Sequence, residues 1–318
     1  MEYNYKNINC IVAGGAGFIG QNLVNKLIED GAKVYVIDNF SYGTSKSNVN
    51  KKAHIIEGDI RDTDVFEKLP RQQYGYLFYF ASPSSVVLFK QDPNECLDIT
   101  IGGFINCINY CAKNKIKIIY PSSGKVYMGA ESPSAENTQL HWNALDTYAK
   151  SKSILENIAS AYEKICDSLG LRIFAGFGPS EKHKGKHASA IYLFCKEMVG
   201  GEIPVIWGDG TQTRDFVYID DLARAILILA QNSKESIVNI GSGEAISFNK
   251  VVEIINSILE TNIIPEHIEK PKFYVEETLA DTLILKKYCP QLQYSPEDGI
   301  REVIKSLNLL SEDLQEIK

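Results

Sequence analysis

Residues 13–20 read Ala-Gly-Gly-Ala-Gly-Phe-Ile-Gly, and this stretch decides the fold. It follows an apolar run, Ile8–Val12, and opens a segment with helical spacing of apolar residues, Phe18–Ile28. Its glycines fit a dinucleotide-binding turn in two ways, as Gly14, Gly17 and Gly20 or as Gly15, Gly17 and Gly20. In both fits the glycines allow a tight turn, a close approach of the backbone to a pyrophosphate, and close packing of helix on strand.

An acidic residue completes this unit at the end of the next apolar run. Val34–Ile37 leads directly into Asp38, which is the place where this motif carries its acid. A carboxylate there accepts hydrogen bonds from the adenosine ribose and repels a 2′-phosphate. The start of the preceding helix also offers free backbone N–H groups to the phosphates. The pattern therefore predicts NAD, rather than NADP, as the cofactor.

Apolar runs alternate with helical segments along the first half of the chain. Further strands are expected at residues 54–56, 76–81, 116–120 and 171–175, and helices from about 93 to 113 and from 146 to about 169. Apolar strands joined by helices indicate a parallel sheet that is covered on both faces. After residue 176 the loops lengthen and the elements shorten. We predict an α/β fold: a Rossmann-type doubly wound parallel sheet in residues 1–176, partly interleaved with a smaller C-terminal α/β substrate lobe in residues 177–318.

Composition argues against several other classes of protein. The 318 residues carry a net charge of −7, whereas a nucleic-acid-binding surface needs a basic footprint. No apolar run reaches the roughly 18 residues of a membrane span, and the polar N-terminus lacks a signal-peptide core. Seven scattered cysteines indicate free thiols, and we expect Cys107 and Cys111 in the core rather than on a metal. We expect a cytoplasmic protein that binds no nucleic acid, membrane or metal.

A second motif, Tyr-x-x-x-Lys, falls near the start of the long predicted helix. The same spacing occurs twice elsewhere in the chain, so context has to select Tyr148 and Lys152. Only this pair lies near the start of a helix patterned to pack on the sheet, and it also follows Ser123 at the carboxyl end of a predicted strand, where open sheets bind ligands. Residues four apart share a helix face, so Lys152 is expected to lower the pKa of Tyr148. We predict that Tyr148 takes a hydroxyl proton while Ser123 holds the reacting oxygen.

Together these segments resemble the extended short-chain dehydrogenase/reductase family, also called the NAD-dependent epimerase/dehydratase family, and most of all its nucleotide-sugar 4-epimerases. The resemblance covers about Ile8 to Leu307. Besides the glycine stretch, it rests on residues 36–40, 57–62, 80–86, 122–128, 147–152, 205–221 and 239–243. It implies an NAD-dependent enzyme that acts on a nucleotide-diphosphate sugar and forms a homodimer.

The resemblance also implies roles for individual residues. The cofactor would contact Gly14, Gly17, Phe18, Ile19, Gly20, Asp38, Asn39, Asp59, Ile60, Phe80, Ala81, Tyr148 and Lys152. The nucleotide sugar would contact Ser84, Ser123, Lys125, His187 and Arg214, with the Arg214 guanidinium on its diphosphate. The basic loop around His187 is equally compatible with a solvated surface. Trp207 either stacks on a base or fills the core. Lys272 is a candidate cation where the family's Arg-x-Gly-Asp segment is absent.

One segment bears on the reaction. In this family, 4,6-dehydratases carry Asp-Glu after the active-site hydroxyl residue, and sugar-acid decarboxylases carry a Glu before Val-Tyr-Gly. Here those positions hold Gly124 and Lys125, so these reactions lack their acid or base. The leading hypothesis is therefore an NAD-dependent nucleotide-sugar 4-epimerase. Ala175, where an Asn is usual, keeps open a nucleotide-sugar 4-dehydrogenase or 4-keto reductase. A third hypothesis is a protein that binds NAD without turnover.

Overall fold

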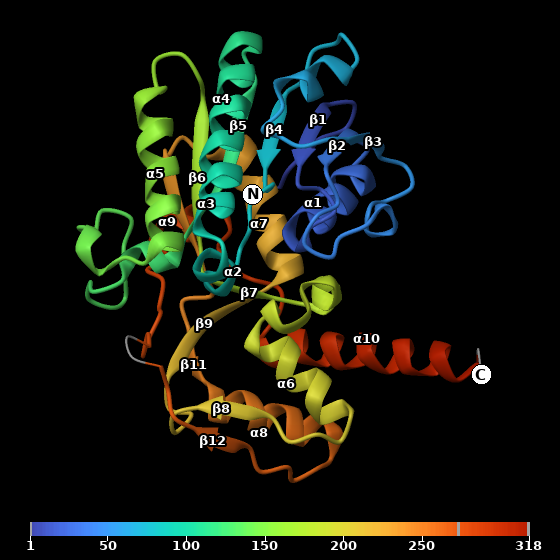
Figure 1. Cartoon of the computed structure of the whole chain (residues 1–318), viewed down its shortest axis with the longest axis vertical. Coiled ribbons are helices and arrows are strands. Elements are labelled where there is room, and N and C mark those ends of the chain that lie inside the picture. The colour runs from blue at the N-terminus through green and yellow to red at the C-terminus, as the bar shows by residue number, and fades with distance from the viewer. Residues whose placement is uncertain (1, 272–273, 317–318) are drawn as a thin grey trace.

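The computed structural model describes residues 2–271 and 274–316, with side chains as far as Asn308. Figure 1 shows strands layered between helices in its upper half and a smaller lobe below them. The C-terminal third of the chain contributes to both parts. Within the described residues, no helix is both long enough and apolar enough to cross a bilayer.

Seven parallel strands form the main sheet, in the order β10-β6-β5-β4-β1-β2-β3. They are β1 (Asn9–Ala13), β2 (Lys33–Asp38), β3 (His54–Glu57), β4 (Tyr76–Tyr79), β5 (Lys117–Ser123), β6 (Ser168–Ile173) and β10 (Ile237–Ile240). The chain runs outward in one direction from β1 to β3 and in the other from β4 to β6. A ligand crevice therefore forms at the carboxyl ends of β1 and β4. The predicted Rossmann-type doubly wound sheet is confirmed.

Both faces of the sheet are buried because alternate strand residues enter two different hydrophobic cores. The covering helices are α1 (Phe18–Glu29) and α7 (Ile219–Asn232) on one face, and α4 (Gly103–Asn114) and α5 (Thr147–Ala161) on the other. Val12 packs in the core with α1 and α7, while its neighbour Ile11 packs in the core with α4 and α5. This explains why the strands read as continuous apolar runs.

The smaller lobe contains two short sheets and several helices. Its elements are β7 (Ala175–Phe177), β9 (Thr213–Tyr218) and β11 (Ala245–Ser247) in one sheet, β8 (Val205–Trp207) and β12 (Glu266–Ile268) in the other, and helices α6 (Ala190–Val199), α8 (Phe248–Leu259) and α10 (Pro296–Glu316). Three further short helices are α2 (Val86–Gln91), α3 (Pro93–Leu97) and α9 (Leu283–Tyr288). They lie along the connections outside these two sheets.

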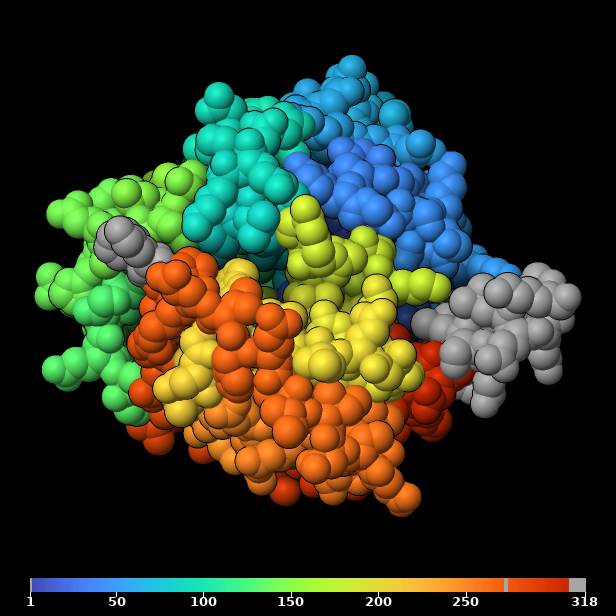
Figure 2. All heavy atoms as spheres, turned by 60° about the horizontal axis from the view of Figure 1, so that its bottom comes forward, coloured from blue at the N-terminus to red at the C-terminus, as the bar shows by residue number. Residues whose placement is uncertain are grey.

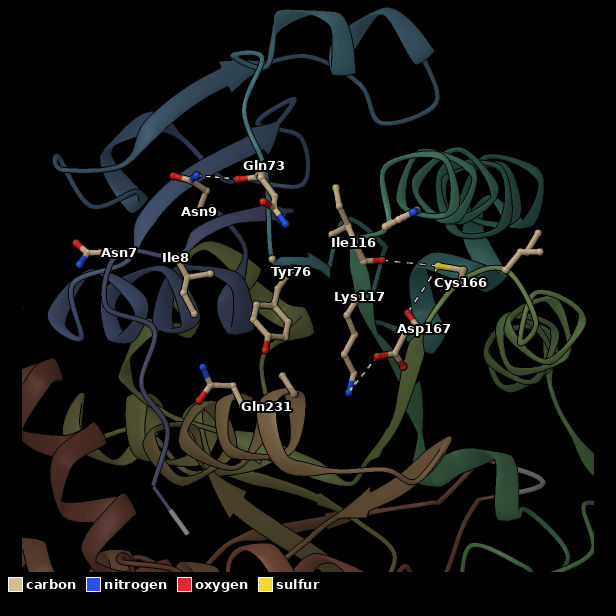
Figure 3. A pocket seen from close by; sticks show the side chains of 14 residues that line it. Asn7, Ile8, Asn9, Gln73, Tyr76, Ile116, Lys117, Cys166, Asp167 and Gln231 are labelled. Carbon is tan, nitrogen blue, oxygen red and sulfur yellow. Dashed lines mark hydrogen bonds and ion pairs between the residues drawn. The ribbon is translucent and has the colours of Figure 1, made fainter.

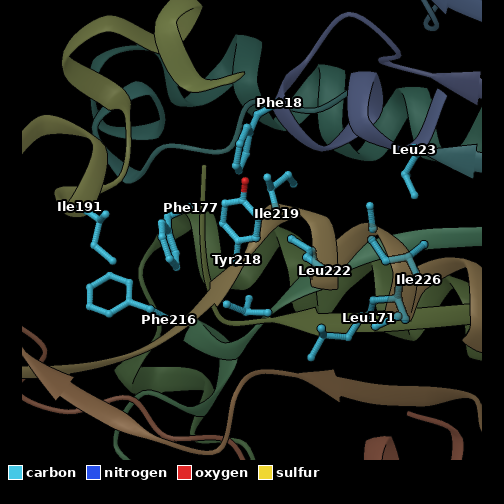
Figure 4. Packing of buried hydrophobic residues seen from close by; sticks show 14 of the residues in the cluster. Phe18, Leu23, Leu171, Phe177, Ile191, Phe216, Tyr218, Ile219, Leu222 and Ile226 are labelled. Atoms are coloured by element: carbon cyan, nitrogen blue, oxygen red, sulfur yellow. The ribbon is translucent and has the colours of Figure 1, made fainter. Parts of the chain in front are cut away.

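One hydrophobic core joins the lobe to the main sheet. Figure 4 shows Leu171 of β6 and Leu222 of α7 in the same packed cluster as Phe177 of β7 and Phe216 of β9. The rings of Phe177 and Phe216 meet edge to face at 6.1 Å. Because this core is continuous, the position of the lobe over the sheet edge is fixed by side-chain packing.

Three predicted boundaries differ from the structure. Helix α5 ends at Ala161 instead of about residue 169, because β6 already begins at Ser168 and pairs with Ile118 of β5. The strand predicted at 171–175 is divided between β6 and β7. The helix predicted from about 93 to 113 is interrupted by a π-helical turn, Asp98–Gly102, between α3 and α4.

Strand β10 shows how the two predicted segments interleave. It comes from the segment 177–318, yet it pairs with β6 and completes the main sheet. Helix α7, which precedes it, covers a face of that sheet. The division at residue 176 and the homodimer both stay predictions.

The seven cysteines are buried and free. Cys107 and Cys111 lie on the buried face of α4, in the core, as the sequence predicted. Within the described part of the chain, no group of three or more His, Cys, Asp or Glu side chains could hold a metal ion.

Candidate active site

A cavity of about 730 Å³ lies at the carboxyl edge of the main sheet, against the smaller lobe. It is lined by the turn after β1, the ends of β2, β4 and β5, the start of α5, and residues of β9 and α8. All predicted site residues except Lys125 line it. A second cavity of similar volume lies at the opposite edge, beside Tyr76, Lys117 and Asp167 (Figure 3). No predicted site residue lines that one, so the first cavity is the candidate active site.

The glycine turn forms the floor of the cavity and resolves the two possible spacings. Gly14 has a φ of +79°, and a Cβ there would lie 2.5 Å from the backbone of Phe80 and Ala81. A Cβ on Gly20 would lie 2.0 Å from the carbonyl oxygen of Gly14. The tight turn therefore begins at Gly14, and the spacing is Gly14, Gly17 and Gly20. The bare backbone that faces the cavity is the surface a pyrophosphate requires.

Asp38 closes one side of this turn. Its carboxylate accepts hydrogen bonds from the backbone N–H of Ala16 at 2.9 Å and of Phe40 at 2.8 Å. Burial raises the pKa of Asp38, and these two N–H groups oppose the rise. Each carboxylate oxygen keeps a lone pair for a further donor, such as a ribose hydroxyl. The turn and the acid thus fit the NAD that the sequence predicts.

A second acid lies further along the same end of the cavity. Asp59 accepts hydrogen bonds from Nη2 of Arg61 at 2.8 Å and from Nδ2 of Asn39 at 3.0 Å. The Arg61 side chain lowers the pKa of Asp59 to about 2. Asp59 is therefore ionised at neutral pH, and it ties Asn39 to the strand end next to the buried Ile60.

Ser123, Tyr148 and Lys152 meet at the other end of the cavity. Helix α5 begins there because the Asp146 carboxylate caps it, accepting from the backbone N–H of Ala149 at 2.9 Å. The Lys152 ammonium lies 5.6 Å from the ring centroid of Tyr148. The ammonium also donates to the Ser82 hydroxyl at 2.6 Å, a contact that the sequence analysis missed.

The protonation of this pair differs from the prediction. Burial raises the pKa of Tyr148, and a hydrogen bond with the Ser123 hydroxyl opposes the rise without cancelling it. Burial also lowers the pKa of Lys152 to about 7. The expected lowering of the Tyr148 pKa by Lys152 is therefore wrong for this structure, because desolvation by burial is the largest cause of the shift and raises the pKa. Tyr148 is protonated at neutral pH, and Lys152 titrates close to neutrality.

Lys125 is the predicted site residue that the structure keeps out of the cavity. Its ammonium lies 2.6 Å from the carboxylate of Asp146, the residue that caps α5. This pairing holds the Lys125 side chain at the start of α5, so it does not line the cavity. Lys272, the other candidate cation, lies outside the described residues.

The basic loop Pro179–His187 is partly cavity wall and partly solvated surface. His183, Lys184 and His187 line the cavity, whereas Lys182 and Lys186 are exposed. His187 places Nδ1 3.1 Å from the hydroxyl of Ser85, the neighbour of Ser84. Lys184, which the sequence analysis did not single out, lies 4.7 Å over the ring of Phe18 and pairs with Glu181 at 2.6 Å. Figure 2 shows this segment lodged between the N-terminal part and the smaller lobe. The run of Lys and His residues was the available sequence signal for this part of the site. Only the fold decides which of these side chains face the cavity.

Arg214 extends from β9 into the cavity beside two aromatic rings. Its guanidinium carbon lies 5.2 Å from the ring centroid of Tyr274 and 5.5 Å from that of Phe248. Within the described residues, no carboxylate forms an ion pair with Arg214. The neighbouring Asp220 pairs with Lys26 instead. A guanidinium with no acidic partner in the wall of a cavity suits an anionic ligand.

Trp207 does not fill the core. Its side chain is 44 % exposed, and its ring meets that of Tyr274 edge to face at 5.7 Å. It does not line the cavity itself, but Tyr274 connects it to Arg214. The core alternative is therefore wrong, and base stacking stays a prediction.

The fold and the site define an enzyme that binds a dinucleotide at the edge of a Rossmann-type sheet. Residues 10–241 match the model of the NAD dependent epimerase/dehydratase family, and the chain belongs to this family of NAD-dependent enzymes. A protein of Methanocaldococcus jannaschii, provisionally named a UDP-glucose 4-epimerase, is 36 % identical over 301 residues, which cover 93 % of this chain and 95 % of that one.

Solved structures agree with this assignment. The UDP-N-acetylglucosamine 4-epimerase of Methanobrevibacter ruminantium has a TM-score of 0.87 at 30 % identity and covers 96 % of this chain and 99 % of its own. The UDP-glucose 4-epimerase of Thermotoga maritima has a TM-score of 0.90 at 27 % identity, with 96 % and 100 % covered. The heptose 6-epimerase of Alkalilimnicola ehrlichii, compared by sequence, is also 30 % identical, with 93 % and 97 % covered. Similarity thus reaches relatives of more than one reaction.

Proposed function

We propose that this protein is a 4-epimerase of a nucleoside-diphosphate sugar. The observation that carries the proposal is that Ser123, Tyr148 and Lys152 line one cavity together with Arg214, at the far end from the glycine turn. The segment after Ser123 supplies no carboxylate, since its residues are Gly124 and Lys125 and the latter is turned away to Asp146. This supports chemistry at carbon 4 over water elimination or decarboxylation.

The proposed mechanism assigns a task to each side chain. Because Tyr148 is protonated at neutral pH, its phenol first gives its proton to the neutral amine of Lys152. The phenolate then removes the proton of the sugar 4-hydroxyl and later returns it, while Ser123 holds the same oxygen by a hydrogen bond. Lys152, with a pKa of about 7, passes a proton to and from this end of the cavity near neutral pH. NAD, when bound on the glycine turn and Asp38, supplies reversible hydride transfer at the same carbon. Rotation of the 4-keto sugar between the two transfers exposes its other face.

Arg214 is the proposed anchor for the substrate during that rotation. A guanidinium offers a planar fork that matches two phosphate oxygens. The chain of contacts from Arg214 to Tyr274 and on to Trp207 supports a base that stacks on these rings. The two solved 4-epimerases described above are named for UDP-sugars, which supports uracil as the first base to test.

The test is a substrate panel. Purified protein is incubated with UDP-glucose, UDP-N-acetylglucosamine, UDP-glucuronate and their GDP and CDP counterparts, and ¹H NMR follows the sugar signals. We expect one sugar to be converted to its C4 epimer until equilibrium, with Tyr148→Phe as the inactive control. The absence of a C4 epimer from every member of the panel would contradict the proposal.

A second candidate is a nucleotide-sugar 4-dehydrogenase or 4-keto reductase. It is favoured by Ala175, which lines the cavity where the family usually has an Asn and so removes one polar contact. Here the same incubation would give a lasting change in NADH absorbance and a 4-keto sugar, without an epimer. A transient change that accompanies an epimer would exclude this candidate.

A further inference from the structure

A buried polar cluster lies directly beneath the proposed catalytic residues. Its members are Ser122, Tyr127, Glu136, Glu156, Arg172 and Asn239, which come from β5, the 3-10 turn Gly124–Tyr127, the loop before α5, α5 itself, β6 and β10. The side chains of Glu156 and Arg172 at its centre are only 10 % and 6 % exposed. None of its members belongs to the proposed mechanism.

Glu156 joins three elements through one carboxylate. It lies one helical turn after Lys152 on α5. Its Oε1 accepts from the Ser122 hydroxyl at 2.5 Å and from Nε of Arg172 at 2.9 Å, and its Oε2 accepts from Nη2 of Arg172 at 2.8 Å. The helix that carries Tyr148 and Lys152 is thereby tied to the strand that ends at Ser123.

Arg172 continues the cluster on its other side. Its Nη1 donates to the Tyr127 hydroxyl at 2.8 Å and to the backbone carbonyl of Glu136 at 3.0 Å. The Tyr127 hydroxyl donates in turn to Oδ1 of Asn239 at 2.7 Å. The Asn239 backbone N–H donates to the Glu136 carboxylate at 2.8 Å. A strand of the C-terminal segment thus supports the turn that follows Ser123.

Ser123 lies between two points that this cluster holds. Ser122 precedes it and is bonded to Glu156, and Tyr127 closes the turn after it and is bonded to Arg172. We propose that Glu156 and Arg172 are positioning residues that fix the Ser123 hydroxyl against Tyr148 and Lys152. The inference rests on the proposed function, in which Ser123 must hold the reacting oxygen within hydrogen-bond reach. An error of about 1 Å at such a centre costs about 100-fold in rate.

The arrangement fits positioning better than stability alone. Replacing a buried ion pair by apolar side chains is often neutral or stabilising, so a buried pair is weak evidence of a role in stability. The pair instead fixes the orientation of the side chains that bond to it. Each of its members bonds to a residue on one side of Ser123.

The closing experiment removes one hydroxyl from each end of the cluster and keeps the central ion pair. The variants are Ser122→Ala and Tyr127→Phe, in the NAD-loaded protein. Ser153→Ala, a buried serine of the same helix as Glu156, and Tyr120→Phe, a buried tyrosine of the same strand as Ser122, are the matched controls. In the described residues neither control hydroxyl bonds to the cluster.

We expect kcat to fall about tenfold in each variant, with KM within about twofold of the control value and a fall in Tm no larger than the loss of one buried hydrogen bond explains. The Ser123 hydrogen bond lowers the pKa of Tyr148, so loosening it raises that pKa. The limb of the plot of kcat against pH that reflects the Tyr148 phenolate should therefore move to higher pH. A merely structural role would lower Tm without moving this limb.

The central pair is tested by a double variant, Glu156→Gln with Arg172→Met, because a single change leaves a lone buried charge and can prevent folding. It is expected to fold and to lose at least as much kcat as the hydroxyl variants. Variants whose kcat and pH profile match those of the controls would overturn the proposal.

Failure of the proposed function is seen separately, because wild-type protein would then convert no sugar. In that case the distance between Ser123 Oγ and the Tyr148 hydroxyl is compared in crystal structures of NAD-loaded wild type and variants. A displacement of about 0.5 Å or more supports positioning. An unchanged distance overturns it.

Discussion

The two ends of the active-site cavity are built in different ways. The cofactor end is made from strand ends that follow one another near the start of the chain: the turn at Gly14, Asp38 and Asp59. The other end brings together Ser82, Lys152 and Arg214 from segments that lie far apart in the sequence. The first end presents the bare backbone of a glycine turn to the cavity, whereas the second is lined by side chains. A change at the first end should therefore act on cofactor binding, and a change at the second on turnover or on substrate binding.

The largest expected effect is at the catalytic end. Tyr148→Phe removes the proposed proton acceptor and keeps the ring that meets Phe89 edge to face at 5.4 Å. We expect kcat to fall by about 10²–10⁴-fold with NAD binding unchanged, since general acid–base catalysis contributes that much. Steady-state kinetics and a fluorescence titration with NAD measure the two quantities. Tyr192→Phe, at the buried tyrosine of another Tyr-x-x-x-Lys on α6, is the control and should keep its activity.

At the cofactor end, Gly14→Ala should weaken the binding of NAD, whereas Tyr148→Phe lowers kcat. The added Cβ would meet the backbone of Phe80 and Ala81 at 2.5 Å, in a residue with φ of +79°. We expect NAD affinity to fall about 100-fold, as measured by isothermal titration calorimetry. Gly201→Ala is the matched control, because Gly201 has a φ of +73° but no atom within 4 Å of the added Cβ. It should lose about 1 kcal/mol of stability and no NAD affinity. Equal losses of affinity would show that strain, and not crowding, decides the effect.

A smaller effect is expected from Arg214→Met at the substrate end. The change removes the cation that faces the cavity without an acidic partner among the described residues and keeps an apolar side chain against Phe248. Loss of a charge-assisted contact of about 1.5–3 kcal/mol should raise KM for the nucleotide sugar by about 10- to 100-fold. NAD affinity should stay within twofold. Arg301→Met, at an exposed arginine of α10, is the control. If Arg214→Met also lost NAD affinity, the proposed division into a cofactor end and a substrate end would be wrong.

The smallest expected effect is a pH dependence of stability from Lys152. Burial lowers its pKa to about 7, so between pH 7 and about 10 the unfolded chain holds a proton that the folded protein has lost. The free energy of unfolding should therefore rise with pH across this window, by up to about 1.4 kcal/mol per pH unit relative to Lys152→Met. Urea denaturation of both proteins at pH 7, 8, 9 and 10 gives this difference. A constant difference would mean that Lys152 keeps its proton in the fold.

Much of the cofactor end could be predicted because its information is local. A strand, a glycine turn, a helix and an acid after the next strand follow in order along the chain, so spacing alone brings them together. The same holds for Tyr148 and Lys152, which share a helix face by their separation of four. The sequence did not reveal which glycine turns the chain, since that depends on the approach of Phe80 and Ala81 from β4.

The substrate end was harder to predict because its contacts are made at a distance. Lys125 was expected in the site by its position, but Asp146 takes its ammonium. Lys184 and Ser82 were missed, although both line the cavity, because no local pattern indicates which side of a loop faces inward. The basic loop alone was compatible with both a surface and a wall.

The sequence by itself determined the fold class, and it predicted the NAD contacts and the proposed catalytic trio from spacing within one element or between successive ones. Only the tertiary structure decided the protonation of Tyr148 and Lys152 and the buried contacts of Glu156 and Arg172. Desolvation depends on everything that packs around a group, so the directions of the Tyr148 and Lys152 pKa values could not be read from their neighbours in sequence. The contact between Glu156 and Arg172 could not be predicted from the sequence either. It joins a helix to a strand through long-range packing, and no sequence spacing indicates it.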